Sequence, residues 1–388
     1  MAASGGSLCL LLIGHVLAVR MDKFLNNLSI SEVMGDLYGP VVRVITAVSG
    51  ILASVGTLAG QFLVMSKMLA MMLDLENTSA TKTAAVIVII YSAFGGARAV
   101  TLTDIFQLLV FSTLLPSLSL VIWNGFESTD EVVQVITKDP IFSLETIFSW
   151  DGESSYYWGL LLYYIIPGLR PPIFQRIIMA SDTKQAKEAF AYAAALDFLM
   201  LLTVAWIATL LLATSGNLVP NKLVDHLIIT YAYPGLRGFL VVGITALAMS
   251  TADSILNACS VLIVNDLIKP ISPSFEVSVL AARTYAVVLG TLGLLLALLF
   301  EGNLLGLFLR SSSFYMPIVT VPLLMAIFGF KSSPRAALIG MLAGFLVVAS
   351  WDSLFSHWGI QSLIPGMLAN LVFLVGTHFL LGDDDVCI

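Results

Sequence analysis

Long apolar runs separated by short polar segments dominate this sequence. Eleven of them approach the roughly 20 residues that an α-helix needs to cross a bilayer, allowing for tilt. We expect these spans at Gly5–Val19, Val44–Leu73, Thr83–Gly95, Asp104–Trp123, Tyr156–Ile173, Ala189–Thr214, Gly238–Asp266, Val279–Phe300, Leu304–Phe330, Ala336–Trp351 and Ile364–Leu381. The pattern therefore predicts an all-α, polytopic membrane protein with about 11 transmembrane helices.

One run, Gly238–Asp266, carries polar residues in its middle. At about 100° per residue its polar side chains fall on one half of the helix and its apolar side chains on the other. Hydrocarbon offers no hydrogen-bond partner, so this face is predicted to point into a protein bundle or a water-filled cavity, as an ion-binding helix would. The polar set is Ser250, Thr251, Asp253, Ser254, Asn257 and Ser260.

Two other segments interrupt the apolar pattern. Trp158–Arg176 contains three prolines and a glycine, which break the backbone hydrogen-bond ladder, and such helices are tolerated in membranes where they line a cavity. In Tyr91–Gln107 a Gly-Gly pair ends one run, and Thr103-Asp104 would cap the next through side-chain bonds to free amides. We predict a cavity-lining broken helix and a tight hairpin on the inner side of the membrane.

Composition agrees with a membrane protein and excludes several functions. Hydrophobic residues make up 58% and charged residues 11% of the chain, against roughly 45–50% and about 25% in soluble domains. The cysteines and histidines are dispersed, without the spacing of a disulfide framework or a zinc site, and there is no basic tract for nucleic acid. Because no nucleotide-binding or hydrolase motif occurs, we do not expect an enzyme.

The distribution of basic residues predicts the orientation. If the amino terminus is outside, twelve lysines and arginines fall on inner ends and loops and four on outer ones, a clear positive-inside signal. The inner set is Arg20, Lys23, Arg43, Arg98, Arg170, Arg176, Lys184, Lys187, Lys269, Arg283, Lys331 and Arg335, and the outer set is Lys82, Lys138, Lys222 and Arg237. We expect a multi-pass protein of the plasma or inner membrane, with its carboxyl terminus in the cytoplasm.

Three motifs, in this order, resemble the sodium/solute symporter family, which includes carriers of proline, pantothenate, sugars, iodide and short carboxylates. They are the hairpin residues Gly95, Gly96, Ala99, Val100, Thr103, Asp104 and Gln107, the broken-helix end Pro171–Arg176 followed by Met179–Asp182, and the helix residues Met249, Ser250, Thr251, Asp253 and Ser254. The resemblance runs from about residue 5 to residue 382. It implies a LeuT-like bundle of two inverted five-helix repeats, with substrate and sodium bound midway across the membrane.

On this resemblance the whole chain, residues 1–388, is one transmembrane transporter domain. Residues 5–123 would be the remainder of the first repeat, 156–330 the second repeat and 336–381 additional C-terminal helices. Counting back from the hairpin, the first run matches the second helix of the first repeat, so we expect the family's broken first core helix to be missing. That expectation keeps two alternatives open: a non-transporting, carrier-like sensor and an inactive truncated remnant.

The resemblance also implies ion-site residues. Sodium is a hard cation that prefers oxygen donors, and the family's pattern assigns it the hydroxyls of Ser250 and Thr251 and the carbonyl of Leu247. Na⁺ would be the coupling ion, with no other metal and no cofactor. The alternative for the hydroxyls is bonding to carbonyls one turn back, and for Asp104 a helix N-cap. The residues expected on the sodium path, or as its electrostatic support, are Asp104, Asp253 and Ser254.

For the substrate, we expect the broken helix to supply the lining. The candidates are Trp158, Tyr163, Tyr164 and Pro171. Proline carriers of the family place a Trp and a Tyr one turn apart here, whereas the position four residues after Trp158 is Leu162, which argues against proline. The expected function is sodium-coupled secondary active symport of a small organic solute, preferably an amino acid or carboxylate, by alternating access.

Two further charges, Asp197 and Arg310, fall within apolar runs. A charge inside the membrane is costly, and pairing would reduce the cost for both residues. We therefore hypothesise a buried Asp197–Arg310 ion pair, although Asp253 could replace Asp197. Alternatively, Arg310 could face the cavity and meet a substrate carboxylate.

Overall fold

The computed structural model describes residues 4–126, 128–138, 142–143, 152–214, 223–272, 274, 278–355 and 360–381, without the side chains of residues 96–99, 131, 152–155 and 352. Over these ranges the regular structure is helical, without β-strands. Among the described residues nine helical segments are long and apolar enough to cross a membrane, and each coincides with a predicted span. Nine of the eleven predicted spans are thus confirmed as long apolar helices, and the fold class is all-α.

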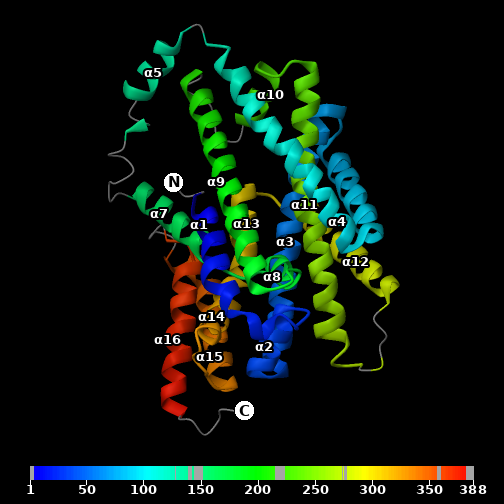
Figure 1. Ribbon diagram of the computed structural model, residues 1–388, viewed down its shortest axis with the longest axis vertical. Helices are drawn as coiled ribbons and strands as arrows, with labels where there is room; N and C mark the ends of the chain where they lie inside the picture. The colour runs from blue at the N-terminus through cyan, green and yellow to red at the C-terminus, as the bar shows by residue number, and fades with distance from the viewer. Residues whose placement is uncertain are drawn as a thin grey trace.

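The long helices form a bundle in which several axes lie near the vertical of Figure 1 and others run obliquely to it. They are α3 (Pro40–Leu73), α4 (Asn77–Trp123), α9 (Thr183–Thr214), α11 (Pro234–Val261) with its π-helical continuation η6 (Leu262–Ile268), α12 (Val279–Leu299), α13 (Leu304–Ser313) with η7 (Met316–Thr320) and α14 (Val321–Ile327), α15 (Pro334–Phe355) and α16 (Leu363–Leu381). The shorter helices are α1 (Ser4–Leu12) with η1 (Ile13–Leu17) and η2 (Ala18–Arg20), η3 (Asp22–Phe24), α2 (Ile30–Tyr38), α5 (Thr129–Lys138), α7 (Gly152–Ile165), α8 (Pro171–Ile178) and α10 (Leu223–Thr230).

The two remaining predicted spans are short or broken. The first run forms a shorter apolar helix, Ser4–Arg20, made of α1, η1 and η2. The run Tyr156–Ile173 is discontinuous, as predicted: α7 ends at Ile165 and α8 begins at Pro171. Proline suits the first position of a helix because its missing N–H would have no partner there, so the double proline that breaks one helix also starts the next.

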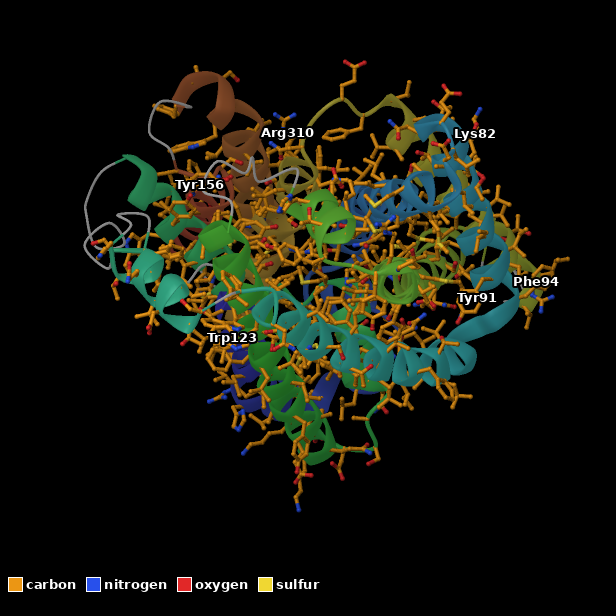
Figure 2. All side chains as sticks on the ribbon, turned by 90° about the horizontal axis from the view of Figure 1, so that it is seen from above. Lys82, Tyr91, Phe94, Trp123, Tyr156 and Arg310 are labelled. Atoms are coloured by element: carbon orange, nitrogen blue, oxygen red, sulfur yellow. The ribbon has the colours of Figure 1, made fainter. Side chains whose placement is uncertain are left out.

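Helix α4 contains the predicted hairpin. As a straight helix its 47 residues would extend about 70 Å, more than twice the roughly 30 Å hydrocarbon core. The hydroxyls of Tyr91 and Thr103 lie 2.6 Å apart, although twelve residues of straight helix would separate their backbones by about 18 Å. The chain therefore turns back between two spans, and Figure 2 shows it running from Lys82 to Phe94 at one edge and then across the bundle to Trp123.

Helix α11 lies at the centre of the packing. Its apolar residues belong to two hydrophobic clusters, one shared with α3, α12 and the first half of α4, the other with α9, α10 and the second half of α4. It also contacts α8. On the predicted polar face Asp253 and Ser260 are buried, whereas Ser250, Thr251, Ser254 and Asn257 are partly exposed.

The continuation of α11 is tied to α2 and α3. Asp266 in η6 is fully buried and accepts hydrogen bonds from Arg43 Nε of α3 at 2.8 Å and from Ser29 Oγ at 2.6 Å. Ser29 is also the N-cap of α2, where its hydroxyl accepts from the Glu32 N–H at 3.0 Å. One carboxylate thus joins three elements at this end of the bundle.

Candidate functional site

A cavity of about 390 Å³ lies between α11 and the break that separates α7 from α8. Its size falls within the range of about 300–1,000 Å³ that is usual for small-molecule sites. It brings together the two segments that the sequence singled out, the polar face of α11 and the end of the broken helix. Its polar lining is Ser54, Thr57, Arg170, Arg176, Ser250, Thr251 and Ser254, and its apolar lining includes Leu10, Pro171–Ile173, Phe190 and Tyr315.

An ionic cluster joins three helices at one wall of this cavity. Ser250 Oγ of α11 donates to Asp104 Oδ1 of α4 at 2.5 Å. Arg176 Nη2 of α8 donates to Asp104 Oδ2 at 2.6 Å and to Ser254 Oγ at 2.9 Å. The N-cap interpretation of Asp104 is wrong, because this residue lies inside α4 and its carboxylate bonds to α8 and α11 instead.

The other two predicted sodium ligands are neighbours. Thr251 Oγ1 donates to the Leu247 carbonyl at 3.3 Å, the bond to the preceding turn that Thr commonly makes in membrane helices. A hydroxyl that donates its proton keeps its lone pairs, so the Thr251 oxygen can still face a cation. Of the three predicted ligands, Ser250 and Thr251 line the cavity and Leu247 does not; hydroxyl oxygens such as these two suit a hard cation such as sodium.

Asp253 is fully buried, and neither carboxylate oxygen has a hydrogen-bond partner among the described residues. It is not part of the cavity lining, but it lies within electrostatic range of Asp104 and Arg176. Burial of a carboxylate without a donor or a counter-ion is costly in a membrane protein. This arrangement favours a nearby cation.

The predicted substrate residues divide into two pairs. Pro171 lines the cavity, and the buried Tyr163 contacts it indirectly through Arg170, whose Nη2 donates to the Tyr163 hydroxyl at 3.3 Å. Trp158 and Tyr164 are not among the lining residues of this cavity. Of the predicted aromatic residues none lines this cavity directly, and only Tyr163 is linked to it, through Arg170, so their contact with a substrate stays a prediction.

The hypothesised pair of Asp197 and Arg310 is not formed. Asp197 Oδ2 of α9 accepts a hydrogen bond from Ser7 Oγ of α1 at 2.6 Å. Arg310 is exposed and lines a different cavity of about 780 Å³, together with Lys67 and Tyr156. Figure 2 labels Arg310 and Tyr156 on the same side of the molecule, in agreement with this lining.

Sequence reasoning missed three residues of the central cavity. Arg170 and Arg176 were counted among the inner ends and loops, yet both line the cavity. Removing them leaves ten inner basic residues against four outer ones, so the predicted asymmetry remains. Tyr315 is almost fully buried and its hydroxyl donates to the Leu169 carbonyl at 2.9 Å, which ties η7 to the break. The signal for the arginines was their position beside prolines inside an apolar run.

A helical bundle with a central polar cavity at a helix discontinuity is the architecture of a membrane carrier. This chain belongs to the sodium:solute symporter family, whose model matches residues 2–344. It is 25% identical over 303 residues to the high-affinity proline transporter PutP of Bacillus subtilis, covering 74% of this chain and 62% of that protein. It is 24% identical over 310 residues to sodium/proline symporter 2 of Staphylococcus saprophyticus, covering 74% and 59%.

The chain therefore spans about three fifths of the length of these two curated relatives. Among solved structures, it resembles a Na⁺-coupled sialic acid symporter in a substrate-bound, outward-open state. The TM-score is 0.78 at 17% identity, and the match covers 96% of this chain and 89% of that one. The predicted LeuT-like fold is confirmed by this likeness, which extends to the fold alone.

Proposed function

We propose that this protein is a sodium-coupled secondary active symporter that carries a small organic solute by alternating access. The observation that carries the proposal is the shared cavity: hydroxyls of the polar face of α11 and the break between α7 and α8 line the same space. We further propose a plasma or inner membrane location, with the amino terminus outside and the carboxyl terminus in the cytoplasm, on the asymmetry of basic residues.

Sodium would bind to the hydroxyls of Ser250 and Thr251 and to the Leu247 carbonyl. These are uncharged oxygen donors of the kind that a weakly held monovalent cation requires, and a coupling ion must leave the site in every cycle. Asp104 accepts a hydrogen bond from the Ser250 hydroxyl, so its carboxylate adds negative potential beside the site. Asp253 and Ser254 would support the ion or lie on its path.

The cluster of Asp104, Arg176 and Ser254 offers a means of coupling. A sodium ion beside Ser250 would compete with Arg176 for the Asp104 carboxylate, and Arg176 belongs to α8 whereas Asp104 belongs to α4. Filling the ion site would then change the free energy of the contact between these helices. An ion shifts a conformational equilibrium only through such differential interactions.

The test is solute uptake into proteoliposomes that contain the full chain, driven by an inward sodium gradient and measured with labelled amino acids and small carboxylates. We expect sodium-dependent uptake of at least one solute, and its loss in the double variant Ser250→Ala, Thr251→Ala. The matched control is Thr113→Ala, Ser117→Ala, because these exposed hydroxyls of α4 also donate to preceding carbonyls but lie outside the cavity. Equal uptake in sodium and potassium gradients would contradict the proposal.

A further inference from the structure

The cavity wall formed by the α7–α8 break carries an arginine with only neutral partners. Arg170 Nη2 donates to Ser312 Oγ at 2.7 Å and to Tyr163 Oη at 3.3 Å, with Met316 Sδ at 3.5 Å. Among the described residues no carboxylate lies within ion-pair distance of Arg170. All of these bonds use one nitrogen, so Nε and Nη1 remain available as donors.

An uncompensated guanidinium is costly at this depth. The residue precedes α8, which lies near mid-height of the bundle in Figure 1, and it is only partly exposed. Charged groups inside a membrane protein usually pair with one another or face a functional cavity. Arg170 faces the cavity but has no charged partner among the described residues. The missing charge compensation points to a ligand that is an anion.

The other residues that line the cavity also favour a negatively charged ligand. They include a second arginine and no acidic side chain. The first turn of α8, at Pro171–Ile173, also lines the cavity and adds no negative charge to it. The Asp104 carboxylate is engaged by Arg176 and Ser250, so it offers no free counter-ion for an ammonium group.

We propose that Arg170 binds the carboxylate of the transported solute, and that this solute is a small carboxylate anion without an ammonium group. This inference rests on the proposed function and narrows its substrate class. Two nearly fully buried residues, Ser312 and Tyr163, hold the guanidinium toward the cavity through their hydroxyls. Zwitterionic amino acids are rejected because their ammonium group would lie in a cavity lined by two arginines and no acid.

The experiment measures ligand-dependent thermal stabilisation of the purified full chain in sodium buffer. The probes are straight-chain carboxylates from acetate to hexanoate, the corresponding amides and the corresponding 2-amino acids. We expect stabilisation by carboxylates of one length range, and little by the amides or the amino acids. In Arg170→Gln the apparent affinity for the best carboxylate should fall by about 30-fold or more, the usual effect of truncating a buried charged partner.

The matched control is Arg237→Gln, which removes an exposed arginine outside the cavity and should leave the affinity unchanged. If Arg170→Gln does not fold, phenylglyoxal labelling of the wild-type protein replaces it. The carboxylate should then protect Arg170 from modification, as read by peptide mass spectrometry, while Arg237 stays reactive.

Sodium binding separates this inference from the proposed function. We expect Arg170→Gln to keep ²²Na⁺ binding, because the ion ligands lie on α11, and to lose only the carboxylate response. Amides that stabilise as well as carboxylates, amino acids that stabilise better, or no response to any carboxylate would overturn the inference and leave sodium coupling standing. Absence of ²²Na⁺ binding in the wild type would instead overturn the proposed function.

Discussion

Arg170 and Arg176 are six residues apart and line the same cavity, yet they have opposite surroundings. Arg176 has a carboxylate partner, Asp104, and a hydroxyl of α11 beside it. Arg170 has two hydroxyls and a thioether, and no acid among the described residues. The charge of Arg176 is therefore compensated within the fold, whereas Arg170 leaves a positive charge available to a ligand.

The two arginines also differ in what they connect. Arg176 joins α8 to α4 and α11, so a change at the proposed ion site would alter its contacts with the broken helix. Arg170 joins the start of α8 to α13 and α7. We infer that the cavity has two walls that share the short helix α8. The ion wall is formed by Ser250, Thr251 and Ser254 with Arg176, and the solute wall by Arg170 with the residues that hold it.

The largest expected effect on stability comes from Asp104→Asn. The substitution leaves Arg176 without its counter-ion, but the Arg176 side chain is 37% exposed, so solvent reduces the cost to about 1–3 kcal/mol. Denaturant unfolding of the purified protein measures it. In the double variant Asp104→Asn, Arg176→Gln much of the lost unfolding free energy should be recovered. Strictly additive losses from the two substitutions would show that the pair is not coupled.

Arg170→Gln should behave differently and sharpen the comparison. Because no acid is left unpaired, we expect the free energy of unfolding without solute to change by less than about 1 kcal/mol, or to increase. The same unfolding measurement applies. A loss as large as that of Asp104→Asn would mean that Arg170 has a structural partner and would contradict the division into two walls.

Neutralising Asp253 tests the ion wall. Asp253→Asn removes a buried carboxylate that has no hydrogen-bond partner, so the sodium-free protein should gain about 1–2 kcal/mol of stability. Sodium-dependent stabilisation should become weaker, since the negative potential near the ion site falls. A substitution that destabilises the protein and leaves the sodium response intact would show that Asp253 has a structural role instead.

The two hydroxyls that hold Arg170 are expected to affect carboxylate affinity less than Arg170→Gln itself does. Ser312→Ala removes the 2.7 Å bond and Tyr163→Phe the 3.3 Å bond, so the first should weaken carboxylate binding by about tenfold and the second by about threefold or less. Titrations of the best carboxylate against each variant measure both. A larger loss of carboxylate affinity in Tyr163→Phe than in Ser312→Ala would show that Tyr163, and not Ser312, is the main residue that positions Arg170.

Much of the fold followed from the sequence because its signals are local. Apolar run length predicted eleven spans, nine of which are long helices among the described residues, and Pro167, Pro171 and Pro172 predicted the break. The polar face of α11 was visible because helical periodicity separates Ser250 from the apolar side. The hairpin in α4 was also predicted, although the helical backbone continues through the turn.

The partners of the charged residues could not be read in the same way. Asp104 and Arg176 are 72 positions apart, and run length says nothing about which helices become neighbours. The pairing of Asp197 with Arg310 was inferred from their placement in apolar runs, but Arg310 is exposed and Ser7 supplies the partner of Asp197. Arg170 and Arg176 were counted among the inner ends and loops because the predicted span Tyr156–Ile173 ends beside them.

The central claim is that hydroxyls of α11 bind sodium in the cavity. The most direct measurement is a ²²Na⁺ binding isotherm on the purified full chain, with the double variant Ser250→Ala, Thr251→Ala beside it and Thr113→Ala, Ser117→Ala as the control. Saturable binding in the wild type and the control, with at least a tenfold loss in the cavity variant, is the predicted result. Unchanged binding in the cavity variant would contradict the claim.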